Sequence, residues 1–190
     1  MGKRLTKVVT RTGDSGTTGM ADGSRRSKDD PRVHALGEVD ELNAQLGVVL
    51  SLLGKTEPSD VLFAIQHDLF DIGAELCQPG KSLISKKHVE ALEHHVETFN
   101  AELSPLREFI LPGGSPAVAS LQLSRAVCRR VERSLVALDQ ADTINSMTRQ
   151  YLNRLSDLLF ILARTQAKRE GAGETYWKSE YSRLNRDDSN

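Results

Sequence analysis

The stretch "SRAVCRRVERS" (124–134) carries four arginines and one glutamate within nine consecutive positions. On a helix, Arg125, Arg129 and Glu132 would share one face, because they are separated by four and three residues. Neighbouring guanidinium groups repel one another unless an anion or carboxylates lie close by, and each can bind a phosphate or carboxylate through two N–H groups. The stretch therefore predicts an anion-binding face. A solvated, arginine-rich helix surface has the same pattern and stays open as an alternative.

A second candidate for anion binding is "TRTGDSGTTG" (10–19), which contains three glycines and five hydroxyl side chains. Backbone amides in glycine-rich turns form concave anion sites, and Lys28, after a further turn, supplies a positive charge. The loop is neither of the two common glycine-rich fingerprints, since no Gly-Lys-Ser/Thr follows it and no strand-linked G-x-G-x-x-G is present. It is interpreted as a phosphate-binding loop or as a flexible arm.

Small and polar residues share one helical face in "GEVDELNAQLG" (37–47). Gly37 and Gly47 would each cost a helix about 1 kcal/mol. A close contact should compensate for this cost, either with a ligand or with the backbone of another helix or subunit. Asp40 lies on the same face and is a candidate carboxylate partner for a buried Arg125.

The segment "FILPGGS" (109–115) places Phe109 and two aliphatic residues before Pro-Gly-Gly. An apolar loop tip of this kind either joins the core or faces a flat hydrophobic ligand. In contrast, no zinc-type spacing, di-iron Glu-x-x-His pattern or Ser-His-Asp arrangement is evident, so no metal-ligating residues are expected.

These residues must be positioned by helices. Apolar residues recur at helical spacing in five segments, and no convincing strand pattern is present. The expected helices cover residues 32–54, 58–77, 85–103, 115–139 and 145–171. The first should bury Val33 and Leu36, and the strongly polar third should lie outside. Five helices of about twenty residues predict an all-α, antiparallel bundle.

Around this bundle domain (32–171), residues 1–31 form a long polar N-terminal arm that is either functional or disordered, and residues 172–190 form a C-terminal tail that we interpret as docking on a neighbour. The net charge of −1 gives no global field for nucleic acid. Residues 3–32, with eight Lys or Arg against four Asp, carry a local charge of +4 that suits a compact anion. Two cysteines and the lack of a signal peptide or membrane-length apolar run indicate a cytoplasmic protein with no membrane partner.

Six blocks occur in the same order in the PduO-type ATP:cob(I)alamin (corrinoid) adenosyltransferases, which this chain resembles from about residue 7 to 170. The blocks are "TRTGDSGTTG", "KDDPRV", "GEVDELNAQLG", "FILPGGS", "SRAVCRRVERS" and "YLNRLSDLLFILAR". The resemblance implies a ferritin-like five-helix bundle that forms a homotrimer with active sites between subunits.

The resemblance also implies a reaction: the 5′-deoxyadenosyl group of ATP moves to cobalt(I) of cob(I)alamin, giving adenosylcobalamin and tripolyphosphate. Mg²⁺ would accompany the nucleotide. A flavoprotein reductase and an adenosylcobalamin-dependent enzyme are possible partners. The alternatives are a nucleotide-binding regulatory bundle without turnover and a phosphohydrolase that uses the same ATP site.

Residue roles follow from the resemblance. Phe109 matches the aromatic beneath the corrin, and Asp40 and Arg125 match an intersubunit ion pair. The residues that match the ATP-binding arm are Thr10, Arg11, Thr12, Gly13, Thr18 and Lys28. Those that match a second nucleotide wall are Arg129, Arg130, Val131, Glu132, Arg133 and Asn153.

Overall fold

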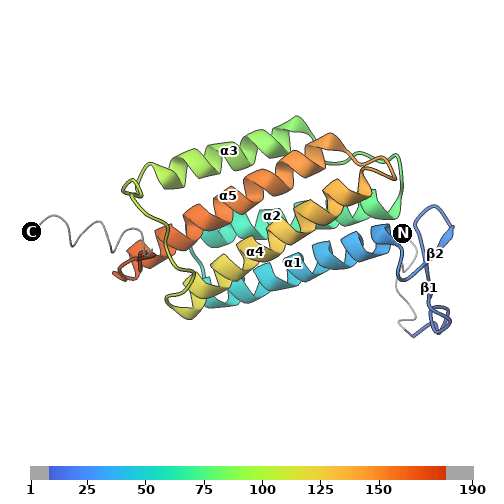
Figure 1. The fold of residues 1–190 in the computed structure, drawn as a ribbon, viewed down its shortest axis with the longest axis horizontal. Helices are drawn as coiled ribbons and strands as arrows, with labels where there is room; N and C mark the ends of the chain where they lie inside the picture. The colour runs from blue at the N-terminus through green and yellow to red at the C-terminus, as the bar shows by residue number, and fades with distance from the viewer. Residues whose placement is uncertain (1–8, 179–190) are drawn as a thin grey trace, which may run out of the picture.

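A computed structural model of the chain describes residues 9–178. Within this range lie five helices, whose chain direction alternates from each to the next (Figure 1). They are α1 (Pro31–Leu53), α2 (Glu57–Cys77), α3 (Lys86–Asn100), α4 (Pro116–Leu138) and α5 (Ser146–Arg169). All five predicted helices are thus confirmed. The first eight residues of the predicted arm and the last twelve of the predicted tail lie outside the described residues.

Side-chain caps and prolines explain where the helices begin. Ser115 accepts a hydrogen bond from the backbone N–H of Val118 (3.3 Å), and Pro116 takes the first helical position of α4. At α1, Asp30 caps in the same way before Pro31. Because these signals are local, the predicted boundaries agree with the structure to within a few residues.

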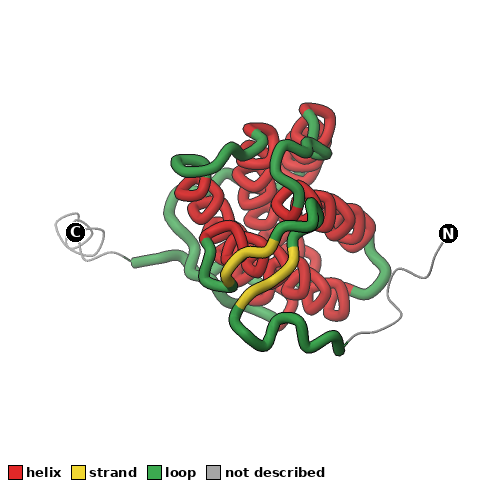
Figure 2. Tube along the Cα trace, turned by 90° about the vertical axis from the view of Figure 1, so that its right-hand side faces the viewer, coloured by secondary structure: helices red, strands yellow, loops and turns green. Residues whose placement is uncertain are grey.

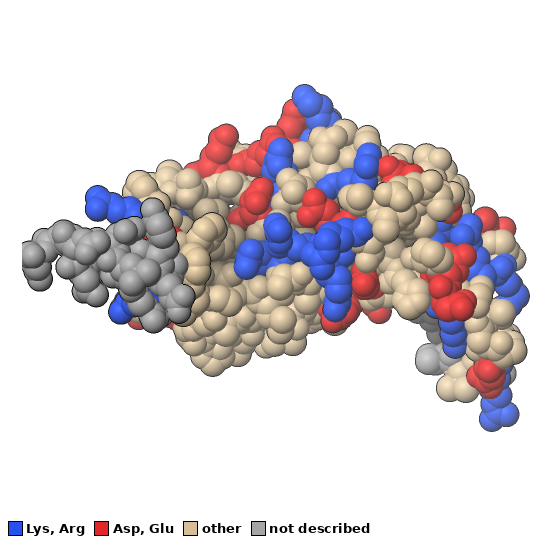
Figure 3. All heavy atoms as spheres, viewed as in Figure 1, with Lys and Arg blue, Asp and Glu red and all other residues tan. Residues whose placement is uncertain are grey.

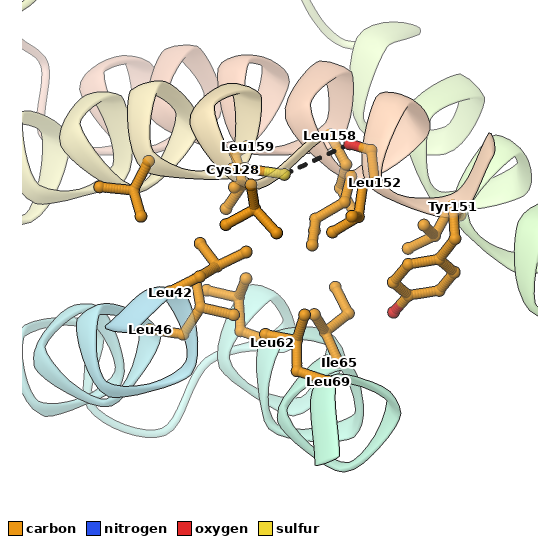
Figure 4. Packing of buried hydrophobic residues seen from close by; sticks show 14 of the residues in the cluster. Leu42, Leu46, Leu62, Ile65, Leu69, Cys128, Tyr151, Leu152, Leu158 and Leu159 are labelled. Carbon is orange, nitrogen blue, oxygen red and sulfur yellow. Dashed lines mark hydrogen bonds between the residues drawn. The ribbon is translucent and has the colours of Figure 1, made fainter. Parts of the chain in front are cut away.

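The core lies between the α1/α2 pair and the α4/α5 pair (Figure 4). α4 packs against both α5 and α1, α2 packs on α1, and α3 covers α5. The Cys128 thiol, fully buried, donates to the carbonyl of Leu152 across the α4–α5 contact (3.3 Å). The apolar residues that recur at helical spacing in α4 and α5 face this core, among them Leu121, Leu135 and Leu155. None of the helices in residues 9–178 has the length and apolar character that a bilayer span requires.

The buried face of α1 differs from the prediction near the start of the helix. Val33 and Leu36 are only half-buried, whereas Ala35 and Leu42 are fully buried. Arg32, whose side chain is 1% exposed, takes the inward position three residues before Ala35. Val33 and Leu36 line a surface groove between α1 and α2, and Leu36 also packs against the edge of the core.

Arg32 forms a buried polar contact at the end of the bundle where α1 starts. Its guanidinium bonds to the Asp142 carboxylate in the α4–α5 loop (2.7 Å) and to the carbonyl of Leu76 at the end of α2 (3.3 Å). Asp142 also pairs with Arg26 of the arm (3.5 Å). One buried cation thus joins α1, α2 and the α4–α5 loop, and its carboxylate partner reaches the arm.

The sequence predicts no strands, and this prediction is wrong. β1 (Thr17–Gly19) and β2 (Arg25–Ser27) form an antiparallel ribbon in the arm, seen in yellow in Figure 2. Each strand has three residues, too few for an alternating pattern to stand out. The ribbon docks on the bundle through buried Met20 and through a hydrogen bond from the N–H of Ala21 to the carbonyl of Cys77 (3.0 Å).

The described part of the tail pairs with its own chain. Tyr176 forms a β-bridge with Ile110 in the α3–α4 loop. Docking of the tail on a neighbouring subunit stays a prediction.

Two leucines on α4 offer a test of the core. Leu121 is 0% exposed and Leu123 is 53% exposed. We expect Leu121→Ala to lower the free energy of unfolding by about 2–5 kcal/mol, because a cavity remains in the core. Leu123→Ala removes the same atoms and should cost less than about 1 kcal/mol. Urea unfolding followed by circular dichroism measures both, and equal losses would contradict this placement of the core.

Candidate functional site

A surface cleft of about 500 Å³ opens between α4, α5 and the α3–α4 loop. Three of the predicted site residues line it together, Phe109, Arg125 and Arg129. The cleft therefore combines an apolar aromatic with two cations. Figure 3 shows basic side chains gathered across the middle of this face, over α4 and α5.

Further cleft residues were not singled out by sequence patterns. Gln122, Ser156 and Phe160 line the cleft, but each falls within an apolar helix stretch and carries no charge. The packing of α4 against α5 brings these three residues to a shared surface beside the α3–α4 loop. Asp157 is the acidic residue of α5 in the lining.

Arg125 is half-buried at this cleft. Its guanidinium lies 5.7 Å from the centroid of the Phe160 ring, and its Nε donates to Gln122 Oε1 (3.1 Å). Burial lowers the pKa of Arg125, and the charge of Arg129 lowers it further. Among residues 9–178 no carboxylate forms an ion pair with Arg125. The cation thus has no opposite charge against it in the described part of the chain.

Asp40, its predicted partner, is exposed on α1. It takes part in no ion pair within the described part of the chain and does not line the cleft. It lies at the groove between α1 and α2, beside Gly37. One chain by itself therefore does not form the predicted Asp40–Arg125 pair.

The remaining arginines of α4 have different surroundings. Arg130 pairs with Glu41 and with Glu38 (3.6 Å) on α1, so carboxylates of the same chain neutralise it. Arg133 is exposed and donates to the carbonyl of Arg129 (3.1 Å). Arg129 itself is exposed and has no ion pair within residues 9–178. Of the three, Arg129 is the one with charge available at the cleft.

Other predicted wall residues do not reach the cleft. Val131 is fully buried in the core, so its side chain cannot touch a ligand. Glu132 accepts a hydrogen bond from Asn153 (3.0 Å), and Asn153 accepts one from Arg154 (2.7 Å). These polar groups border the arginine cluster on α4 and α5 but do not line the cleft.

The glycine-rich loop has a defined structure that depends on Arg25, a residue sequence patterns did not indicate. Its guanidinium donates to the carbonyl of Thr12 (2.6 Å) and to the hydroxyl of Thr17 (2.7 Å). A Cβ on Gly13 would come within 3.2 Å of the Thr17 carbonyl and 3.3 Å of Lys28 Nζ. The Lys28 ammonium therefore lies over the loop backbone, as an anion site requires.

The other predicted arm residues frame this loop. Thr10 and Thr12 share a hydrogen bond between their hydroxyls (3.0 Å), and Arg11 adopts a left-handed conformation (φ 58°). Thr18 lies on β1 opposite Arg26. All of these groups except the strand residues are exposed to solvent.

Arm and cleft are far apart in one chain. Figure 1 shows the arm at the end where α1 begins, whereas the α3–α4 loop that carries Phe109 lies at the opposite end. None of the arm residues from 9 to 31 lines the cleft. The described part of the chain also has no cluster of three or more His, Cys, Asp or Glu that could hold a metal ion.

Replacing Arg25 tests whether it organises the arm. Arg25→Ala removes several hydrogen bonds, each contributing about 1 kcal/mol, so the amides of residues 12–28 should exchange hydrogen roughly tenfold faster. Amides in the middle of α4 should be unaffected. Hydrogen exchange with mass spectrometry measures both regions. Arm exchange equal to that of the parent protein would show that Arg25 does not hold the loop.

Comparison with known proteins agrees with the resemblance noted from the sequence. The sequence model of the family "Cobalamin adenosyltransferase" matches residues 8–166. A cobalamin adenosyltransferase from Cupriavidus metallidurans is 50% identical over 183 residues, covering 95% of this chain and 98% of the relative. A corrinoid adenosyltransferase from Mycobacterium leprae is 44% identical, covering 86% and 93%.

Among solved structures, a phenylalanine-to-alanine variant of the PduO-type ATP:corrinoid adenosyltransferase from Lactobacillus reuteri, complexed with cobalamin and ATP, superposes with a TM-score of 0.85. It is 34% identical, and the match covers 91% of this chain and all of the other. With a family match over most of its length, the chain belongs to the cobalamin adenosyltransferase family.

Proposed function

We propose that this protein transfers the 5′-deoxyadenosyl group of ATP to the cobalt of reduced cobalamin and releases tripolyphosphate. The observation that carries the proposal is the cleft in which Arg125 and Arg129 lie beside Phe109 and Phe160. Such a hollow offers cations to a polyphosphate and an apolar wall to a flat ring. The relatives named above have this activity in their names.

The proposed reaction requires no nucleophile from the protein. Cobalt(I) of the substrate attacks the 5′ carbon of ATP, and the C5′–O bond breaks as the electron pair leaves with tripolyphosphate. The protein must align these atoms and stabilise the departing negative charge. Arg129 has an uncompensated charge at the cleft, and Lys28 has its ammonium over the arm loop. Both suit that role, which accounts for the lack of a Ser, Cys or His arrangement in the sequence.

Phe109 suits a role next to the corrin. Its side chain is 76% exposed, which argues against the alternative that this loop tip belongs to the core. An apolar ring below cobalt would keep out water and the lower axial base. Cobalt(II) without that ligand accepts an electron more readily, so the protein would tune the substrate by controlling its coordination.

The active unit we propose is a homotrimer in which the arm of each subunit completes the cleft of a neighbour. Support comes from the distance between arm and cleft in one chain and from the unpaired state of Arg125 and Asp40 among the described residues. A Cβ on Gly37 would meet nothing within 4 Å, so the helical cost of this glycine is not explained by packing within the chain. An approaching subunit would explain it.

Product analysis tests the function. With ATP, cobalamin and a strong reductant, the protein should yield adenosylcobalamin, seen by its absorption spectrum, together with tripolyphosphate. ADP and orthophosphate instead would identify a phosphohydrolase, and nucleotide binding without product would favour a regulatory bundle. Magnesium as the companion of ATP, a partner reductase and a cytoplasmic location stay predictions.

Replacing Arg129 should affect ATP use selectively. Arg129→Ala removes a positive charge that would stabilise the phosphates, so kcat/KM for ATP should fall about 100-fold. Arg129→Lys keeps the charge but cannot form a bidentate contact with a phosphate, so its kcat/KM should fall less. As a control, Arg149→Ala removes the same charge from a pair with Asp139 outside the cleft. Steady-state kinetics at saturating cobalamin compares the three, and an Arg129→Ala rate close to that of the control would remove Arg129 from the site.

Asp40→Asn tests the proposed subunit contact. It keeps the side-chain shape but removes the charge that would pair with Arg125 of a neighbouring subunit. The trimer should therefore be weaker, and the protein concentration below which it dissociates should rise roughly tenfold. Glu97→Gln removes a charge from the exposed face of α3 and is the control. Sedimentation velocity over a dilution series gives the oligomeric state. Equal dissociation of both variants would contradict the Asp40–Arg125 pair.

A further inference from the structure

Residues 174–177, named here the strap, run antiparallel beside the loop that carries Phe109. The N–H of Trp177 donates to the carbonyl of Phe109 (2.7 Å), and the N–H of Leu111 donates to the carbonyl of Thr175 (2.8 Å). These two bonds enclose the bridge between Ile110 and Tyr176. The backbone from Phe109 to Leu111 is therefore held by the strap.

A buried arginine anchors the strap to the bundle. Arg164 of α5 is 6% exposed, and its Nε bonds to the Glu174 carboxylate (2.6 Å). Its Nη2 donates to the carbonyl of Ser104, at the start of the same α3–α4 loop (2.7 Å). A single guanidinium thus joins α5, the strap and the loop. Because a buried charge without its partner is costly, this arrangement favours one position of the strap.

The strap also touches the Phe109 side chain. The ring of Trp177 meets that of Phe109 edge-on, with centroids 6.3 Å apart and planes inclined by 62°. Phe109 is 76% exposed, so the core does not hold its ring, and Trp177 is the aromatic against it among the described residues. A free phenyl ring would lose rotational freedom on binding a ligand, whereas a ring held in place does not.

The strap adds little to the core itself. Tyr176 and Trp177 remain 46% and 48% exposed, although both are large and partly apolar. Residues that served mainly to stabilise the bundle would bury more of this area. Their partly open position beside the cleft instead fits a role in shaping it.

We infer that Trp177 is a positioning residue: through the strap it holds Phe109 in the orientation that closes the lower face of the corrin. The inference rests on the proposed function, since it assigns to Trp177 the placement of the ring that acts on cobalamin. Arg164 and Glu174 hold the strap itself.

Kinetics of full-length variants test this role. Trp177→Ala should lower kcat with cob(II)alamin under reduction about three- to tenfold, which matches the typical strength of an aromatic pair. The KM for ATP should stay unchanged, and Trp177→Phe should recover most of the rate. Lys178→Ala, at the exposed next position, is the control and should behave as the parent protein.

A spectroscopic readout separates positioning from stability. With ATP and cob(II)alamin bound, the electron paramagnetic resonance spectrum reports whether cobalt carries a lower axial ligand. Trp177→Ala should increase the fraction with that ligand at an unchanged melting temperature. A Trp177→Ala variant with the parent rate and parent spectrum would overturn the inference and leave the proposed function intact.

The contact can also be tested without any corrin. Trp177 is the only tryptophan of the chain, so its fluorescence reports on the strap alone. Phe109→Ala and Glu174→Gln should each shift the emission to longer wavelength, because the indole becomes more exposed to water. Unchanged emission in both variants would show that strap and loop are not coupled. If the parent protein makes no adenosylcobalamin while these shifts occur, the proposed function fails and the contact stands.

Discussion

The ion pair between buried Arg32 and partly exposed Asp142 is the constraint that joins α1, α2, the α4–α5 loop and the arm at one end of the molecule. A guanidinium that is 1% exposed requires partners, and α2 and the α4–α5 loop provide them. The same carboxylate binds Arg26, so the arm is joined to the bundle at this point. Such a pair contributes orientation more than stability, since removing the Arg32 charge from water offsets much of its attraction to a carboxylate that stays 30% exposed.

The four arginines of α4 have different roles because their surroundings differ. Carboxylates of α1 neutralise Arg130, and the ring of Phe160 shields Arg125. Arg129 keeps its charge available at the cleft. This division explains how α4 tolerates so much positive charge beside the core: each cation has either a partner or access to solvent. It also means that a sequence motif can contain both ligand-binding and purely structural members.

Much of the fold follows from local rules that a sequence displays. Caps such as Ser115 before Pro116 determine helix starts, and helical spacing reveals the buried faces of α4 and α5. The short ribbon in the arm could not be foreseen, because three residues are too few to show a period. Nor could the role of Arg25, since its partners are loop oxygens brought near by the turn. Val131 shows the limit of a motif match: it belongs to the matched block, yet its side chain is fully buried in the core, as its helical spacing indicates.

The separation of arm and cleft has a genetic consequence in the proposed trimer. Each site would consist of the cleft of one chain and the arm of another. A chain with a defective arm would therefore impair a different site from the one that contains its own cleft. Two inactive variants, one defective in each half, would then form mixed assemblies in which some sites receive both intact halves. Partial recovery of activity between two such alleles would be a property of the assembly and not of either chain.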